Sequence, residues 1–159
     1  MRPRGGLHAG RVGDERGLLA GDVGVTGPSS AVAAVAAWYP PTDLPALPGD
    51  LGTDPAAADS REAQLLGAPI ATVPDRAAQA SPVAHTSPAA PPFLLLHGRA
   101  DRLVPCVQSA RLRDALRDAG VPVELTTYDG ADHMWRGSPE AADDALARTI
   151  AFLLLRSTR

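Results

Sequence analysis

A continuous apolar run, FLLLHG at residues 93–98, constrains the fold more than any other part of the chain. Such an unbroken run is typical of a strand that is covered on both faces, as in a parallel sheet. Apolar residues at helical spacing then predict a helix over residues 106–119, with Gly120 just past its end. Residues 123–129, VELTTYD, follow as a second strand.

The last segment of the chain predicts another helix. Ser138 is placed to cap its N-terminus, and Pro139 suits the first helical position. Strand, helix, strand and helix with short connections indicate a right-handed parallel crossover, and so an α/β architecture. The apolar pattern predicts that the buried stripe of this helix consists of Ala142, Ala145, Leu146, Thr149, Ile150 and Leu153.

The earlier part of the chain is less regular. Residues 31–39, AVAAVAAWY, form an apolar run that periodicity leaves open between a short helix and a buried strand. Residues 40–92 hold most of the prolines and predict a loop with short helices near 60–66 and 73–79. A stretch this irregular inside a domain is usually a lid, a binding loop or disorder.

Composition narrows the classes of function. The net charge of −3 and the lack of any basic run argue against nucleic acid and anionic membranes as partners. One cysteine excludes an internal disulfide, and no apolar run is long enough to span a bilayer. The N-terminus lacks the apolar core of a signal peptide. We therefore expect a cytoplasmic protein of one domain, without a cofactor or metal.

Two chemically useful side chains follow the two predicted strands. Asp101 lies three residues after the end of the FLLLHG strand, and His133 lies four residues after Asp129. Ligands of open α/β sheets bind at the carboxyl ends of the strands, where these side chains would meet. A buried carboxylate that accepts the Nδ1 proton of an imidazole leaves the other nitrogen free to act as a base. The alternative is a surface aspartate and an unrelated loop histidine.

At these residues the sequence resembles a known family. PPFLLLHGRADRLVP followed by VELTTYDGADHMW is similar to the C-terminal half of α/β-hydrolase fold serine hydrolases, in the esterase/lipase and prolyl-oligopeptidase-like branch. In that branch an H-G-x-x-D-x-x-V-P loop carries the acid of the catalytic triad, and a G-x-x-H loop carries the base. The resemblance thus implies that Asp101 is the acid and that His133 is the base.

The same resemblance organises the rest of the chain. AAWYPPTDL, LLGAP and ASPVAH are similar to the segment that follows the nucleophile in such esterases. It implies that residues 31–39 are a strand and that residues 40–92 are a lid-like insertion. The expected division is an irregular segment at 1–21 and a partial α/β-hydrolase domain at 22–159, with about three parallel strands.

The nucleophile of this family has no counterpart in the chain. The serine of these enzymes lies in a G-x-S-x-G turn, which does not occur here. The best-matching position holds Asp14 or Glu15, and neither has a proton for His133 to remove. Ser29 in GPSSA is a weaker alternative because Pro28 would occupy the strained turn. The position of Cys106, near a helix start, is unsuited to attack beside His133, and a buried or capping role is preferred.

We therefore expect a serine-hydrolase family member that retains the aspartate and histidine but lacks the serine, and so a truncated, inactive fragment. Its full-length relative would hydrolyse a small carboxylic ester or, as a prolyl-oligopeptidase-like enzyme, a short peptide. The alternative is a non-catalytic binding module that self-associates through an exposed sheet edge.

Other side chains near these strand ends have supporting roles in this interpretation. His97 is expected to support the Asp101 loop through hydrogen bonds, and Asp132 is interpreted as a turn residue. His85, His97, Asp132 and His133 could ligate a metal by residue type, but their spacing matches no known ligand pattern.

Three aromatic residues lie near the ends of the predicted strands, namely Trp38, Tyr39 and Trp135. They could line an acyl pocket. Aromatic side chains at such positions more often pack in the core, so both roles stay open.

Overall fold

The computed structural model describes residues 31–157, with side chains up to residue 156. The predicted strands and long helices are all present. The strands are β1 (Val35–Trp38), β2 (Phe93–Gly98) and β3 (Val123–Tyr128); the helices are α1 (Leu47–Leu51), α2 (Arg61–Leu66), α3 (Pro74–Gln79), α4 (Val107–Asp118) and α5 (Pro139–Ser157); the 3-10 helices are η1 (Ile70–Thr72), η2 (Pro82–His85) and η3 (His133–Trp135).

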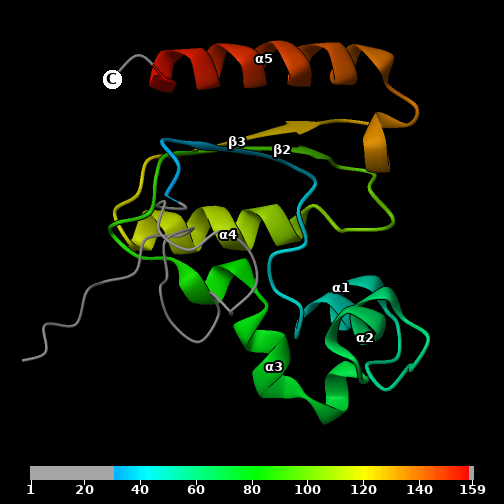
Figure 1. The fold of residues 1–159 in the computed structure, drawn as a ribbon. Helices are drawn as coiled ribbons and strands as arrows, with labels where there is room; N and C mark the ends of the chain where they lie inside the picture. The colour runs from blue at the N-terminus through cyan, green and yellow to red at the C-terminus, as the bar shows by residue number, and fades with distance from the viewer. Residues whose placement is uncertain (1–30, 158–159) are drawn as a thin grey trace, which may run out of the picture.

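The described residues form a three-layer α/β arrangement. The sheet has the order β1-β2-β3, and both neighbouring pairs are parallel. Helix α5 covers one face of the sheet and α4 covers the other (Figure 1). This confirms the α/β prediction of three parallel strands with flanking helices. It also settles the ambiguous run at 31–39, part of which is strand β1.

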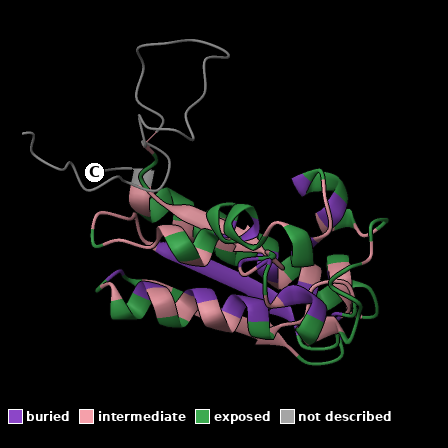
Figure 2. Cartoon of the chain, turned by 90° about the horizontal axis from the view of Figure 1, so that it is seen from below, coloured by how far each residue is buried: buried purple, intermediate pink, exposed green. Residues whose placement is uncertain are grey.

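Strand β2 is the centre of the core. All of its residues are buried, as expected for a strand covered on both faces (Figure 2). Leu94 and Leu96 pack on the α5 side. Phe93 and Leu95 pack on the α4 side. The alternation of side chains along a strand explains why an unbroken apolar run is needed here.

The proline-rich stretch 40–92 has more structure than its composition suggests. The helices predicted near 60–66 and 73–79 are α2 and α3, and the Ser60 side chain caps α2 by accepting the amide of Ala63. Helix α1 was not predicted, because it contains Pro48 and Gly49, which have low helix propensity. The interpretation of this stretch as a lid stays a prediction. Its own small apolar core consists of Leu44, Leu47, Leu66, Ile70 and Ala77.

A buried glutamine fastens this stretch to α4. The Oε1 atom of Gln108 accepts the amides of Thr42 and Asp43, at 2.9 and 2.8 Å. Its Nε2 atom donates to the Asp50 carboxylate, which also pairs with the Arg111 guanidinium. Because every polar atom of this buried amide is used, the contact fixes α1 against the helix that follows the Asp101 loop.

The predicted buried stripe of α5 is partly wrong. Ala145 is buried, but Leu146, Ile150 and Leu153 are 50%, 49% and 40% exposed. Spacing identified an apolar side of the helix. However, no described element fully covers these last three side chains. No helix within the described residues, α5 included, is long and apolar enough to cross a membrane.

The end of β2 approaches the loop after β3 so closely that a side chain would not fit between them. A Cβ atom at Gly98 would lie 2.2 Å from the carbonyl oxygen of Ala131, far inside van der Waals contact. Ala131 itself is fully buried. Glycine at position 98 is therefore required sterically. Because it has no side chain, the loop that carries His133 can pack directly against the loop that carries Asp101.

This contact predicts a large effect for Gly98→Ala. The added methyl group must displace the Ala131 backbone, so we expect a loss of about 3 kcal/mol or more in the free energy of unfolding. Urea unfolding followed by circular dichroism measures it. Gly49→Ala is the matched control, because nothing lies within 4 Å of its Cβ position, and it should change stability by less than about 1 kcal/mol. Equal stabilities for the two variants would contradict the close approach.

Candidate active site

Backbone hydrogen bonds join the loops that carry Asp101 and His133. The amide of Arg99 donates to the Tyr128 carbonyl at 2.9 Å, and the amide of Ala100 donates to the Ala131 carbonyl at 3.0 Å. These bonds extend the pairing of β2 with β3 past the strand ends. The two loops therefore leave the same edge of the sheet side by side.

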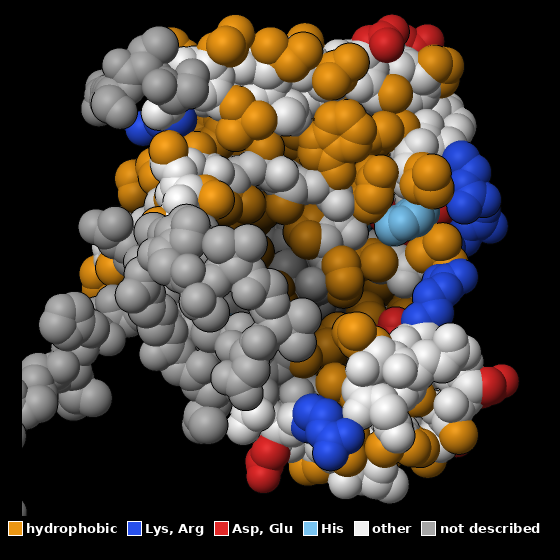
Figure 3. All heavy atoms as spheres, in the orientation of Figure 1, with side chains coloured by type: hydrophobic (Ala, Val, Ile, Leu, Met, Phe, Trp, Pro, Cys, Tyr) orange, Lys and Arg blue, Asp and Glu red, His pale blue; other side chains and the backbone are white. Residues whose placement is uncertain are grey.

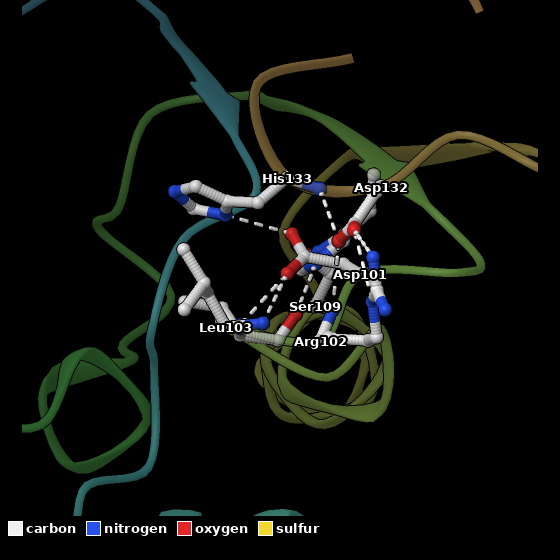
Figure 4. Close-up of polar contacts among 8 residues, drawn as sticks. Asp101, Arg102, Leu103, Ser109, Asp132 and His133 are labelled. Carbon is white, nitrogen blue, oxygen red and sulfur yellow. Dashed lines mark hydrogen bonds and ion pairs between the residues drawn. The ribbon is translucent and has the colours of Figure 1, made fainter. Parts of the chain in front are cut away.

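This arrangement brings the two predicted side chains together. The Nδ1 atom of His133 lies 2.8 Å from Oδ2 of Asp101 (Figure 4). The other carboxylate oxygen, Oδ1, accepts the amides of Leu103 and Val104, at 2.9 and 2.8 Å. The Asp101 side chain is fully buried, whereas that of His133 is 18% exposed. A buried carboxylate is costly unless it is hydrogen-bonded, and here both oxygens have partners.

The contact fixes which nitrogen of His133 carries the proton. An ionised carboxylate can only accept, so Nδ1 of the neutral ring must be the protonated nitrogen. The Nε2 atom then has a free lone pair, and no described residue donates a hydrogen bond to it. The pair can therefore take a proton at Nε2 and stabilise the resulting imidazolium through the carboxylate.

The His133 ring extends across the sheet toward β1. Its centroid lies 4.5 Å from that of Tyr39, the residue directly after β1. Tyr39 has a left-handed backbone with φ of 41°, a conformation that non-glycine residues adopt at a cost. Figure 3 shows a histidine ring at the surface beside apolar and arginine side chains. The His133 ring, with its free Nε2 atom, therefore lies on the side of the Asp101–His133 pair that faces β1.

A buried tryptophan anchors the loop that holds His133. Met134 and Trp135 both have positive φ angles, 58° and 62°. Burial of the Trp135 side chain offsets this strain. The aromatic residues considered for an acyl pocket thus pack together in this cluster. The Trp135 ring lies edge-on to three others, those of Trp38, Tyr39 and Tyr128.

Asp132 joins the two loops from the outside. Its Oδ1 atom accepts the amides of Arg102 and His133, at 3.0 and 2.8 Å. Its Oδ2 atom accepts both Nε and Nη2 of the Arg102 guanidinium. This agrees with the interpretation of Asp132 as a turn residue. The role of Arg102 had no sequence signal, because the partners lie 30 residues apart.

His97 lies behind Asp101, as expected for a supporting residue. Its Nε2 atom lies 2.8 Å from the carbonyl of Val104 and 3.4 Å from Oδ2 of Asp101. Its Nδ1 atom lies 2.7 Å from the hydroxyl of Ser109. Ser109 was not predicted, since a buried serine in the first turn of a helix has no distinctive spacing.

The structure bears on only one of the possible nucleophiles. Ser29, Asp14 and Glu15 lie outside the described residues. Cys106 is at the start of α4, but its side chain makes no capping hydrogen bond. The predicted capping role of Cys106 is therefore wrong, and its side chain is half-buried. Burial raises the pKa of the Cys106 thiol, which disfavours the reactive thiolate.

The described histidines and acidic residues do not gather into a metal site. Within residues 31–156, no group of three or more His, Cys, Asp or Glu side chains could hold a metal ion. His85 is engaged with the Gln79 carbonyl. His97 and His133 are engaged with the partners given above.

The Asp132 contacts predict a pH dependence of stability. The amide and guanidinium of Arg102 hold the pKa of Asp132 well below its usual range. A folded-state pKa below the unfolded value of about 3.9 stabilises the protein above that pH, and the contribution is lost as pH falls. Wild type should therefore be more stable than Asp132→Asn at pH 7, and the difference should shrink below about pH 4.

Urea unfolding of both proteins across this pH range measures the difference. Other acidic residues whose pKa is lowered by arginine, such as Asp50 and Asp144, are common to both proteins and cancel. A difference that stays constant from pH 7 to the acid limit would show that the charge of Asp132 is not responsible.

Comparison with known proteins gives the family. The BD-FAE family model matches residues 14–116, more than half of the chain. The probable carboxylic ester hydrolase LipM of Mycobacterium tuberculosis is 44% identical over 71 residues, which cover 43% of this chain and 16% of LipM.

Solved structures extend the similarity to most of the chain. A truncated form of a carbohydrate esterase from gut microbiota is 28% identical with a TM-score of 0.72, over 82% of this chain and 45% of that one. A puromycin-hydrolyzing peptidase of Mycobacterium tuberculosis is 28% identical with a TM-score of 0.55, over 72% of this chain and 17% of the peptidase. The chain thus spans less than half the length of these relatives. It belongs to the BD-FAE family, and its described part is a partial α/β-hydrolase fold.

Proposed function

We propose that this chain carries the acid and the base of a hydrolase that cleaves carboxylic esters, and that the 159 residues are inactive by themselves. The observation that carries the proposal is the 2.8 Å contact between Nδ1 of His133 and the buried carboxylate of Asp101. We expect inactivity because the chain has no G-x-S-x-G sequence, the turn that presents the serine in this family, and because no described hydroxyl is hydrogen-bonded to Nε2 of His133.

The chemistry of the pair is proton transfer. Nε2 of His133 would take the proton from a hydroxyl as its oxygen attacks the ester carbonyl, and would then give that proton to the departing alcohol. Water would release the acyl group by the same route. Asp101 would keep the ring oriented and stabilise its positive charge without accepting the proton itself.

Ester hydrolysis is favoured over peptide hydrolysis by the relatives. The names of LipM and the gut carbohydrate esterase both describe ester hydrolysis. The puromycin-hydrolyzing peptidase supports the prolyl-oligopeptidase-like alternative. A small ester is the substrate class that we propose for a complete enzyme containing this chain. A short peptide is the second possibility.

Inactivity of the isolated chain is directly measurable. With p-nitrophenyl butyrate we expect wild type and His133→Gln to differ by less than about twofold, since a triad without its nucleophile loses most of its effect. A fluorophosphonate probe should label no serine. Robust turnover with a labelled serine would contradict the proposal, and labelling at Ser29 would identify that residue as the nucleophile.

A chimera tests the roles of the pair. Residues 31–157 can replace the matching part of the gut carbohydrate esterase, which retains its own preceding segment. If the chimera folds and hydrolyses the ester, Asp101→Asn and His133→Gln should each lower kcat by roughly 10³- to 10⁴-fold. Asp129→Asn is a matched control, because among the described residues this exposed carboxylate pairs only with Arg99. Full activity in either pair variant would remove the proposed roles.

A second candidate function is self-association, and the open edge of β1 favours it. The amides of Val35 and Tyr39 donate toward the β2 side, to Pro92 and Leu96. Alternation along the strand then directs the backbone groups of Ala36 and Trp38 to the opposite edge. Among the described strands, β1 pairs only with β2, and unpaired strand edges readily accept another strand.

The exposed apolar side of α5 lies next to this edge of β1. Thr149, which accepts the indole N–H of Trp38, marks the β1 side of the helix, and Asp144, which accepts the Tyr128 hydroxyl, marks the β3 side. Leu146 and Leu153 are three and four residues from Thr149, and so extend beyond β1. Figure 3 shows apolar side chains along this helix at the top of the molecule.

The occupant that we propose is a second copy of the chain. A two-fold axis perpendicular to the sheet would pair the two β1 strands antiparallel and keep both α5 helices on one face. The same apolar residues of the two helices would then face each other, as an isologous interface requires.

Sedimentation velocity tests this second function. Wild type should be dimeric at about 100 μM, whereas Leu146→Lys with Ile150→Lys should be monomeric and folded by circular dichroism. Leu155→Lys is the matched control, since this residue is 71% exposed on the β3 side of α5. A monomeric wild type would exclude the dimer.

A further inference from the structure

A second histidine lies directly behind Asp101, and the proton transfers described above do not use it. His97 is the fifth residue of β2 and is completely buried, as is its partner Ser109 in the first turn of α4. A buried imidazole next to a buried carboxylate is an expensive arrangement unless each nitrogen has a defined partner. The contacts of the ring show what those partners do.

The contacts fix the protonation of His97. A carbonyl oxygen can only accept, so Nε2, which faces the Val104 carbonyl at 2.8 Å, carries the proton. The Nδ1 atom then accepts the hydroxyl proton of Ser109, at 2.7 Å. Burial lowers the pKa of His97, which favours the same neutral ring. His97 is thus a single N–H donor with a fixed direction.

That donor points at the Asp101 loop from the inside. Its second neighbour, at 3.4 Å, is Oδ2 of Asp101, the oxygen that accepts Nδ1–H of His133. Val104 is held at both ends, since its amide donates to Oδ1 of Asp101 while its carbonyl accepts from His97. The ring of His97 therefore closes the loop around the carboxylate.

We infer that His97 is a positioning residue: its Nε2–H, oriented by Ser109, sets the Asp101 carboxylate in the direction that receives the His133 proton. This inference rests on the proposed function, in which Asp101 and His133 act as a pair. It goes further by assigning the orientation of that pair to a neutral histidine and a helix serine.

The two amide substitutes of histidine separate this role from simple core packing. In His97→Gln the side-chain amide reaches the place of Nε2, so a donor toward Val104 and Asp101 is kept while the acceptor for Ser109 is lost. In His97→Asn the amide reaches only the place of Nδ1, so a partner for Ser109 is kept and the donor is lost. Both variants leave a similar gap in the core.

The readout is the hydrogen bond itself, and it does not require catalysis. The full 159-residue chain, labelled with ¹⁵N-histidine, is studied by NMR at pH 7. In wild type the His133 Nδ1–H proton should exchange slowly with water. The nitrogen shifts of His97 should show a protonated Nε2 and an unprotonated Nδ1.

His97→Gln should keep the slow exchange at His133. His97→Asn should accelerate it by about tenfold or more, the effect expected for the loss of one buried hydrogen bond. Equal exchange rates in the two variants, or a His97 ring protonated at Nδ1 in wild type, would overturn the inference.

Two further variants keep the test decisive if His97→Asn does not fold. Ser109→Ala leaves the ring in place but removes the group that orients it, and it should accelerate the exchange by a smaller factor. Ser81→Ala removes the hydroxyl of another fully buried serine, which bonds Ala77 and Leu44, and it should leave the exchange at His133 unchanged. Equal effects of Ser109→Ala and Ser81→Ala would mean that His97 contributes only to general stability.

The result is independent of the hydrolase assignment. A correctly folded chimera without esterase activity would contradict the proposed function, yet the exchange rates would still show whether His97 orients Asp101. Conversely, an active chimera with unchanged exchange in all His97 variants would keep the pair and remove the positioning role.

Discussion

The parallel pairing of β2 with β3 continues past the ends of both strands, and the arrangement of the site depends on this continuation. Two backbone hydrogen bonds hold the following loops together, and Gly98 permits the Ala131 carbonyl to lie where a side chain would otherwise be. Asp101 and His133 are then adjacent because their loops leave the sheet in register. The strand pairing thus supplies the geometry, and the side chains use it.

Several groups around Asp101 stabilise the charges of the site. The Asp101 carboxylate is fully buried and accepts two backbone amides besides the His133 imidazole. His97 supports it from the interior, and the pair of Asp132 with Arg102 closes the loops on the outside. Because a buried charge without partners would cost several kcal/mol, this number of hydrogen bonds is a condition for placing a carboxylate there at all.

The surface proposed for the dimer begins near His133, whose Nε2 atom accepts no hydrogen bond from a described residue. The imidazole reaches toward Tyr39 at the end of β1. The edge of β1 that no described strand pairs with lies next to the exposed apolar side of α5. The proposed dimer would therefore place its interface beside Tyr39, whose ring contacts the His133 imidazole.

The sequence by itself determined the architecture. An unbroken apolar run, two helices with clear termini and short connections leave few alternatives to a parallel sheet, and they place Asp101 and His133 at one edge of it. The sequence also shows that no G-x-S-x-G occurs in the chain. Periodicity could not decide whether residues 31–39 were a helix or a strand, because a short apolar run suits both; the family resemblance favoured the strand.

Only the tertiary structure decided which side chains complete the site. Ser109, Arg102 and Gln108 act on residues 12 to 66 positions away, and contacts between such distant residues leave no local periodicity. The exposure of Leu146 and Ile150 has the same origin, since spacing shows that one side of a helix is apolar but not what lies against it. Local sequence fixes backbone geometry through sterics and capping, whereas partners across the sheet are chosen by packing.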